Sequence, residues 1–279
     1  HSISLVLPEL SFAGGEFFQE IIRGIDNVVE KNNFTLLFSK YAEAENSFYR
    51  IMNENRIDGA LVLGDIFTVK ELEVMDAFNI PIVIVNYRIQ KQMKNLIDVF
   101  SDNERGGELV AEHLILHHGK RKILFLGGGD KYQANILRLK GLMNVAEKHG
   151  VPVQVINGKF ETGFRDGQEI IGRLIREKKM EYDAVFAASD SLGVGVLNAL
   201  MQYQIKVPED VILVSYDNTQ ITNFYPITIS SVEQNAYLMG VKATDILLSK
   251  ILKKEASAPL SGIKVGPELV IRHSCGCKI

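Results

Sequence analysis

Residues 60–85 read ALVLGDIFTVKELEVMDAFNIPIVIV and decide the fold class. Two apolar runs, Ala60–Leu63 and Pro81–Val85, flank a segment around Val69–Phe78 whose apolar residues recur with a helical period. Neither run alternates apolar and polar residues, so both faces of the strand that it forms must be covered by other parts of the chain. This arrangement is typical of a parallel sheet whose strands are connected by helices, and the stretch therefore predicts a β-α-β unit.

The same alternation of short apolar runs and longer helical segments extends through the chain. A first series ends near Phe100, and a second begins with a predicted helix over Asn103–His118 that Gly119 ends. We predict an α/β protein with two doubly wound parallel-sheet lobes around a cleft, the ligands lying beyond the carboxyl ends of the strands. The further predicted strands are Ile3–Pro8, Phe34–Phe38, Ile97–Phe100, Lys122–Leu126, Val153–Ile156, Ala184–Ala187, Val211–Tyr216 and Leu269–Ile271.

Length and composition narrow the functional classes. The chain has 279 residues, enough for about two domains. Lys and Arg total 31 against 34 Asp and Glu, and the net charge is −3. A nucleic-acid surface normally shows a basic excess, so this chain is not expected to hold DNA strongly by itself. No apolar run reaches the roughly 20 residues of a membrane helix, so we expect no membrane partner.

The cysteines and histidines give no strong metal signal. Cys275 and Cys277 are the only cysteines, and a bridge between them would be strained, so a reduced, cytoplasmic setting is expected. His113 and His117 lie four residues apart, and His273 precedes the cysteines, but neither group has the partners of a recognised metal motif. We expect no metal site.

Cofactor and catalytic motifs are also missing from the sequence. Gly127–Asp130 (GGGD) follows a strand but lacks the spacing of a phosphate-binding loop, so a tight turn is the simpler interpretation. The chain contains neither a G-x-S-x-G nucleophile elbow nor an H-E-x-x-H motif. We therefore expect no cofactor and no enzymatic activity.

Polar residues just beyond the predicted strands are more informative. Asn86, Ser189 and Asp217 follow strand ends, and Arg138 lies in the first turns of the helix after Lys122–Leu126. Arg presents a planar fork of donors and Asp accepts two hydrogen bonds, a combination that suits polyols or rings rich in heteroatoms. For Asp190, which also follows a strand, a helix N-cap is the favoured interpretation. Aromatic faces for a ligand can come from Phe12, Phe17, Phe18 and Phe160, although core packing explains each of them equally well.

Several ordered stretches resemble a known family over essentially the whole chain. They are FSDNERGGELVAEHLILHHGKRKILFLGGG (Phe100–Gly129), LRLKGL (Leu137–Leu142), DAVFAASDSLGVGVLNAL followed by VPEDVILVSYDN, SSVEQNAYLMG (Ser230–Gly240) and the ending PELVIRHSC. Together they look like the effector-binding core of lactose-repressor (LacI/GalR) family transcriptional regulators.

The resemblance implies a type I periplasmic-binding-protein fold in which the chain crosses three times between lobes. The implied lobes are 1–100 with 233–264 and 101–232 with 265–279. Family members bind a small effector, commonly a sugar, sugar phosphate, nucleoside or purine, and pair as homodimers. Their contact with operator DNA is made by a helix-turn-helix headpiece before the core, which this chain lacks. The alternative is an exported solute-binding protein of a sugar transporter, which has the same fold but is monomeric.

The resemblance also assigns a binding site, position by position. Arg138 matches the ligand-gripping arginine in LRLKGL, Asp217 matches the aspartate at the end of its strand, and Gln234 lies at a crossover beside the site. Phe17 and Phe18 match paired aromatics, Phe12 lies in the loop before them, and Phe160 corresponds to an aromatic wall residue. Asn86 and Ser189 stand where many members have Asp and Asn, which predicts a pocket that hydrogen-bonds fewer hydroxyl groups than those of the sugar binders.

Overall fold

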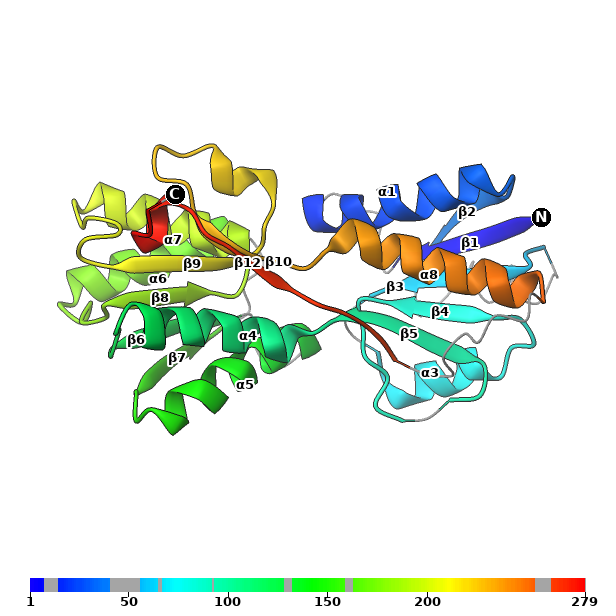
Figure 1. The fold of residues 1–279 in the computed structure, drawn as a ribbon, viewed down its shortest axis with the longest axis horizontal. Helices are drawn as coiled ribbons and strands as arrows, with labels where there is room; N and C mark the ends of the chain where they lie inside the picture. The colour runs from blue at the N-terminus through cyan, green and yellow to red at the C-terminus, as the bar shows by residue number, and fades with distance from the viewer. Residues whose placement is uncertain are drawn as a thin grey trace. The chain divides into compact units, whose positions relative to one another are not determined.

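The computed structural model describes residues 1–7, 15–40, 56–64, 67–91, 93–127, 132–158, 163–253 and 262–278. The chain divides into two compact units. Figure 1 labels the helices and strands of both. Unit 1 comprises His1–Ser101 with Asn235–Val265, and unit 2 comprises Asp102–Gln234 with Gly266–Ile279. Among the described helices, none combines the length and the apolar character needed to cross a membrane.

Unit 1 is built on a parallel sheet with the strand order β11-β5-β4-β3-β1-β2. Helices α1 and α8 pack on one face of the sheet and α3 on the other, as the two buried apolar clusters of this unit show. Its elements are β1 (Ser2–Leu7), α1 (Glu16–Lys31), β2 (Thr35–Lys40), β3 (Gly59–Leu63), α3 (Val69–Asp76), β4 (Ile82–Val85), β5 (Leu96–Ser101), α8 (Ala236–Ile251) and β11 (Ile263–Val265).

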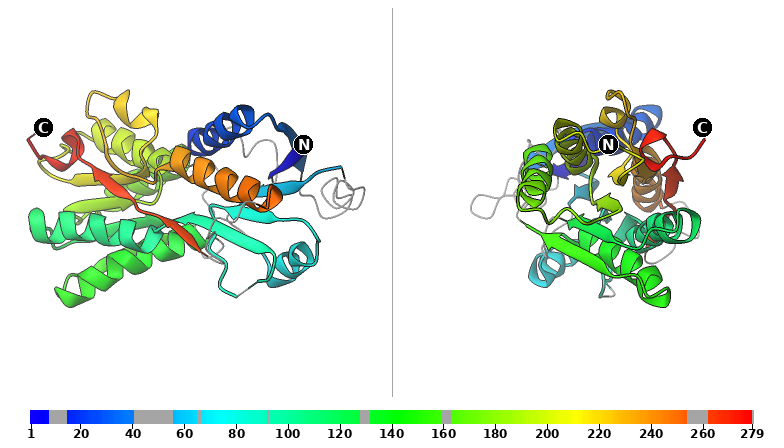
Figure 2. Two further views of the ribbon diagram at one scale, coloured as in Figure 1. Left: turned by 45° about the vertical axis from the view of Figure 1, so that its right-hand side comes forward. Right: turned by 90° about the vertical axis from the view of Figure 1, so that its left-hand side faces the viewer.

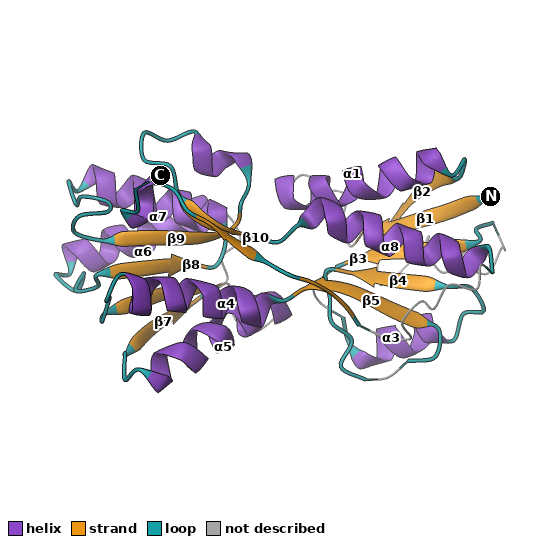
Figure 3. Cartoon of the chain, in the orientation of Figure 1, coloured by secondary structure: helices purple, strands orange, loops and turns teal. Residues whose placement is uncertain are grey.

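Unit 2 repeats this architecture with the strand order β12-β10-β9-β8-β6-β7, in which only the β10–β12 pair is antiparallel among the described pairs. Figures 2 and 3 show its helices beside the sheet. Its strands and α-helices are α4 (Asn103–Ala111), β6 (Ile123–Gly127), α5 (Gln133–Lys148), β7 (Val153–Asn157), α6 (Phe164–Arg176), β8 (Ala184–Ala187), α7 (Asp190–Gln202), β9 (Ile212–Asp217), β10 (Ser230–Glu233) and β12 (Glu268–Val270). Its other helical segments are η2 (Glu112–His117), η3 (Gln220–Asn223) and η4 (His273–Cys275).

The sheet of unit 2 explains why its strands are apolar throughout. Ile123 and Phe125 of β6 pack in the cluster that contains α4 and α5, whereas Leu124 and Leu126 pack in the cluster that contains α6 and α7. Successive side chains of a strand point to opposite faces, so a sheet covered on both faces needs apolar residues at every position. The predicted fold class, two doubly wound parallel-sheet units, is confirmed.

One predicted helix differs in its last turns. The stretch Asn103–His118 is expected to be a single α-helix, but α4 ends at Ala111 and continues as the wider π-helical segment η2. In this wider turn the His118 N–H donates to the carbonyl oxygen of His113 at 3.1 Å. Gly119 then adopts a φ of +64°, a left-handed conformation that glycine takes readily and that ends the helix.

Helices α4 and α5 pack so closely that two glycines are required. A methyl group at Gly141 of α5 would overlap the carbonyl of Glu104, and one at Gly107 of α4 would overlap the carbonyl of Arg138. The two backbones therefore touch where the first turns of α5 pass α4. This contact holds the backbone of Arg138 against the start of α4.

We expect Gly141→Ala to destabilise the protein by about 1–3 kcal/mol, because the added methyl group must push two backbones apart. Gly172→Ala in α6 is the matched control, since its methyl group would meet the flexible end of Arg176 at 3.1 Å and the Tyr203 side chain only at ordinary contact distance. That control should be neutral or gain up to about 1 kcal/mol from helix propensity. Urea unfolding followed by circular dichroism measures both, and equal stability of the two variants would contradict the packing argument.

Candidate functional site

Unit 2 gathers buried polar side chains at the carboxyl ends of its strands. Ser189 and Asp190 follow β8, Asp217 ends β9, and Gln234 follows β10. Parallel strands end at the same edge of a sheet, which brings these positions together. Polar groups at this depth are retained only when they are hydrogen-bonded or when they have a functional partner.

Asp190 ties three of these strand ends together. One carboxylate oxygen accepts from the hydroxyl groups of Ser215, at 2.5 Å, and Ser231, at 2.6 Å. The other accepts from the backbone N–H of Thr219, at 2.6 Å, and from its hydroxyl, at 2.8 Å. Burial raises the pKa of Asp190, and the four donors act against that rise. The side chain is 1% exposed and serves to join the start of α7 to β9 and β10.

The expectation that Asp190 is the N-cap of its helix is wrong. The N-cap of α7 is Ser189, whose hydroxyl accepts from the N–H of Leu192 at 3.3 Å. Asp190 is the first helical residue, and its carboxylate turns into the sheet because Ser215, Ser231 and Thr219 offer it more donors than the helix start does.

Arg138 lies beside this network and is 6% exposed. Its Nε donates to Oδ1 of Asn103 at 2.8 Å, and its Nη1 donates to the carbonyl oxygen of Ala188 at 2.5 Å. The guanidinium carbon lies 3.7 Å from the centre of the Tyr216 ring, a cation–π contact. Arg138 is therefore held by α4, by the end of β8 and by β9.

Asp217 completes the cluster. Its Oδ1 lies 3.6 Å from Nη2 of Arg138 and accepts from Nε2 of Gln234 at 2.7 Å. Burial raises the pKa of Asp217 to about 7, an effect that the neighbouring Arg138 opposes. The Oε1 atom of Gln234 is buried and has no hydrogen-bond partner within the described residues. The cluster thus keeps acceptor capacity on Gln234 that the described part of the protein does not use.

A second network fixes the turn after Asp217. Nη2 of Arg272 donates to Oδ1 of Asn218 at 2.6 Å, and Nδ2 of Asn218 donates to Oε2 of Glu233 at 2.8 Å. Asp217 and Asn218 both have positive φ, at 109° and 54°. Left-handed backbone is strained for side chains other than glycine, so these contacts compensate for a turn that aims Asp217 at Arg138.

Unit 1 holds three of the predicted site residues. The rings of Phe17 and Phe18, in the first turn of α1, meet edge to face with centroids 5.1 Å apart. Both rings pack against the core of unit 1, which agrees with core packing as one of the two interpretations of these residues. Asn86 directly follows β4 with a φ of 69°, and its N–H donates to the carbonyl oxygen of Val99 at 2.8 Å. Phe12, Phe160 and the glycine turn at 128–130 lie outside the described residues.

Sequence reasoning brought Arg138, Asp217 and Gln234 to one place but missed the residues that hold them. Asn103 lies inside the quoted stretch FSDNERGG, directly after a strand, a position of the kind that singled out Asn86. Tyr216 lay inside the predicted strand and was treated as core. Arg272 is in the PELVIRHSC stretch, but nothing in its spacing indicates that it contacts Asn218.

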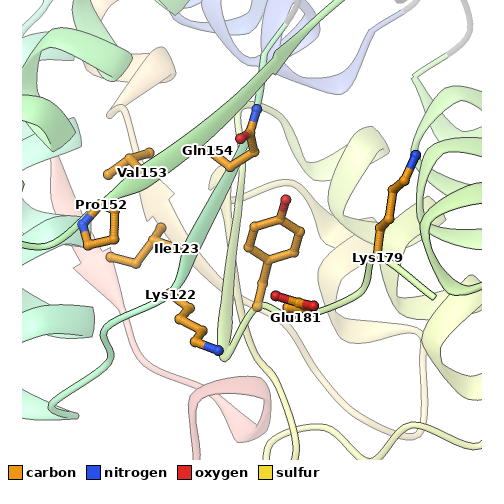
Figure 4. Close-up of a pocket in the computed structure, with 8 residues that line it drawn as sticks. Lys122, Ile123, Pro152, Val153, Gln154, Lys179 and Glu181 are labelled. Atoms are coloured by element: carbon orange, nitrogen blue, oxygen red, sulfur yellow. The ribbon is translucent and has the colours of Figure 1, made fainter. Parts of the chain in front are cut away.

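A surface cavity of about 440 Å³ lies at the other end of the same sheet, at the amino ends of β6 and β7. Figure 4 shows its lining, which includes Lys122, Gln154 and Glu181. Open α/β sheets bind their ligands beyond the carboxyl ends of the strands, so the cavity does not compete with the Arg138–Asp217 cluster as the principal site.

Known proteins support this interpretation of the fold. Residues 111–275 match the periplasmic binding protein-like domain family. The HTH-type transcriptional repressor PurR of Histophilus somni (strain 2336) is 25% identical over 268 residues, which span 92% of this chain and 77% of that protein. The crystal structure of a transcriptional regulator LacI from Bacillus cereus subsp. cytotoxis NVH 391-98 has a TM-score of 0.86 and 25% identity, covering 100% of this chain and 99% of that one.

A LacI family regulator from Enterococcus faecium was solved with bound ribose; it shares 18% identity and a TM-score of 0.82, covering 98% of each chain. At that identity it shows the fold alone.

Two doubly wound units, one of them with a buried polar cluster at its strand ends, define a class of protein: the ligand-binding domains of the type I periplasmic-binding-protein fold. The chain belongs to the periplasmic binding protein-like domain family, and within it to the effector-binding cores of LacI/GalR transcriptional regulators. The relatives that match are transcriptional regulators rather than enzymes, and they favour a regulator over the exported solute-binding alternative.

We expect Asp190→Ala to lower the free energy of unfolding by about 2–4 kcal/mol, because it leaves the Thr219 N–H and two serine hydroxyls without their acceptor. Asp190→Asn should cost less, since its amide can still accept from Thr219 and donate to the serines. Asp245→Ala, at an exposed position of α8, is the control and should stay within about 0.5 kcal/mol. Chemical denaturation measures the free energy of unfolding of all three variants. An unchanged stability of Asp190→Ala would contradict the proposal that Asp190 holds β9 and β10 to the start of α7.

Proposed function

We propose that Arg138, Asp217 and Gln234 bind the polar edge of a small effector, a sugar or a nucleoside-like molecule, and that the chain senses this effector without transforming it. The observation that carries the proposal is the Arg138 guanidinium, which is buried, held by two hydrogen bonds and placed 3.6 Å from Asp217. Such a group recognises a ligand because its direction is already fixed before binding.

The charge of the cluster favours a neutral, hydroxyl-bearing ligand. Arg138 faces Asp217, so the cluster carries little net positive charge with which to hold a free phosphate group. Nη2 of Arg138, beside Asp217, and the Oε1 atom of Gln234, which has no hydrogen-bond partner within the described residues, offer a donor and an acceptor to the same ligand. Hydroxyl groups satisfy both, since each donates one hydrogen bond and accepts others.

The remaining predicted contacts belong to the same proposal. The family resemblance predicts apolar faces from Phe12, Phe17, Phe18 and Phe160 and one amide from Asn86, and these contacts stay predictions. Ser189 already accepts the N-cap bond of α7, and its hydroxyl proton is free to be donated to a ligand.

An effector acts on such a protein only if it binds one conformation better than another. A coupling of about 1–3 kcal/mol between effector binding and conformation is enough to change operator affinity 5- to 150-fold. We propose that the core works in this way as a homodimer in the cytoplasm, and that a headpiece of the family's helix-turn-helix type makes the contact with operator DNA.

Arg138→Ala should abolish measurable effector binding while the fold survives. Each lost charge-assisted hydrogen bond is worth about 1.5–3 kcal/mol, or roughly 10- to 150-fold in affinity. A thermal-shift panel of sugars, sugar phosphates, nucleosides and purines identifies the effector, and calorimetry then compares the variants. Arg138→Lys should also bind poorly, because an ammonium group cannot reproduce the planar fork. Exposed Arg173→Ala is the control, and unchanged affinity in Arg138→Ala would refute the proposed role.

Sedimentation velocity tests the homodimer. We expect a species of twice the 31.2 kDa chain mass at micromolar concentration, because LacI-type regulators pair through their cores. A clean monomer over the same concentration range would support the solute-binding alternative instead. The measurement does not depend on which effector binds. A monomer would therefore contradict the homodimer without contradicting the proposed binding site.

A further inference from the structure

Four side chains far apart in the sequence bring soft ligand atoms together in unit 2. His113, His118, Cys275 and Cys277 each place one ring nitrogen or sulfur in a group whose members all lie within 4.8 Å of one another. Cys277 Sγ lies 3.4 Å from Nε2 of His118. This group is separate from the Arg138–Asp217 cluster and shares no residue with it.

The π-helical segment η2 is what pairs the two histidines. In an α-helix, residues five apart point in different directions. A π turn closes its hydrogen bond between residues five apart and so places their side chains on the same side of the helix. The His118 N–H donates to the His113 carbonyl oxygen, and the two rings lie 4.6 Å apart, nearly perpendicular.

The C-terminal segment places the two sulfurs. Gly276, between the cysteines, has a φ of 80°, a left-handed turn that a residue with a Cβ rarely adopts. Ser274 anchors the segment, since its hydroxyl donates to the Leu213 carbonyl oxygen at 2.6 Å and accepts from the Ser230 N–H at 2.8 Å. The cysteines are therefore positioned by hydrogen bonds of the fold itself.

The protein leaves part of this group unsatisfied. Nε2 of His113 is buried and has no hydrogen-bond partner in the part of the chain that the structure describes. Cys275 is fully buried, and its Sγ donates to the Arg272 carbonyl oxygen at 3.3 Å. A buried imidazole nitrogen without a partner costs stability unless something else binds it.

We propose that His113, His118, Cys275 and Cys277 bind one zinc ion in a closed tetrahedral site. Zinc–sulfur bonds of about 2.3 Å and zinc–nitrogen bonds of about 2.0–2.1 Å require ligand atoms roughly 3.3–3.8 Å apart, and the Cys277–His118 separation already falls in that range. Thiolate and imidazole ligands select zinc over the oxygen-seeking cations calcium and magnesium. On binding, both thiols release their protons, and the dication with two thiolates forms a neutral site.

The chemistry of the site indicates a structural role. Four protein ligands leave no open coordination position for a substrate or an activated water. The ion would join the C-terminal segment to the end of the α4–η2 helix, two parts of unit 2 about 160 residues apart in sequence. Zinc binding free energy would then add directly to the stability of this unit.

The test uses untagged full chain, reduced and stripped with a chelator. Zinc is titrated in competition with a chromophoric chelator, and cobalt(II) serves as a spectroscopic probe. We expect one zinc per chain, and a cobalt complex with a thiolate-to-metal charge-transfer band and the visible bands of tetrahedral coordination. Cys277→Ser and His118→Ala should each weaken zinc at least about 100-fold, the upper end of what loss of an outer-sphere partner causes.

Two histidine variants serve as controls. His149→Ala, at the exposed end of α5, should bind zinc as the unaltered chain does. His117→Ala tests the ligand set, since its Nε2 also lies 3.7 Å from Cys277 Sγ; it should keep the site. Zinc should also slow alkylation of Cys277 by iodoacetamide in the unaltered chain and not in His118→Ala. Absence of the charge-transfer band, or equal zinc affinity in Cys277→Ser and His149→Ala, would overturn the proposal, and circular dichroism confirms that each variant is folded.

Discussion

A buried guanidinium must find acceptors on the elements around it, and Arg138 imposes this constraint on unit 2. Moving a charge out of water costs several kcal/mol unless it is paired and hydrogen-bonded. Asn103 at the start of α4, the Ala188 carbonyl at the end of β8 and Asp217 at the end of β9 supply those partners, and the Tyr216 ring covers one face. Each of these elements must therefore be placed correctly before the side chain can be buried at all.

Two features of the fold make that placement possible. Gly107 and Gly141 let α4 and α5 approach to backbone contact, which sets the reach from Arg138 to Asn103. Asp190 ties β9 and β10 to the start of α7 and so fixes where Asp217 emerges. A site supported in this way rests on helices and strands rather than on loops, and its geometry is established before a ligand arrives.

The fold could be predicted because a sheet covered on both faces requires strands without polar alternation, such as the predicted Lys122–Leu126, in which the residues from Ile123 to Leu126 are all apolar. Only part of the candidate site could be predicted from the sequence. Its position beyond a strand end indicated Asp217, and its position in the first turns of the following helix indicated Arg138. The residue that caps α7, however, depends on whether the donors of the sheet or those of the helix start bind Asp190, and no spacing in the sequence decides this. The π turn is a similar case. Helical spacing pairs His113 with His117, whose rings do stack 5.4 Å apart, but it does not indicate that the wider turn also brings the His118 ring within 4.6 Å of His113.

The short C-terminal segment connects the end of β9, where Asp217 lies, with the histidines at the end of the α4–η2 helix. Arg272 donates to Asn218, the neighbour of Asp217, and two residues later Ser274 binds the carbonyl of Leu213 near the start of the same strand. The segment thus contacts β9 near both of its ends, and the cysteines that follow reach the histidines of η2. A contact that holds residues 273–277 in place therefore also holds β9, the strand that ends at Asp217. The stretch PELVIRHSC would therefore act as a positioning element of the proposed effector site, although Arg272 reaches that site only through Asn218.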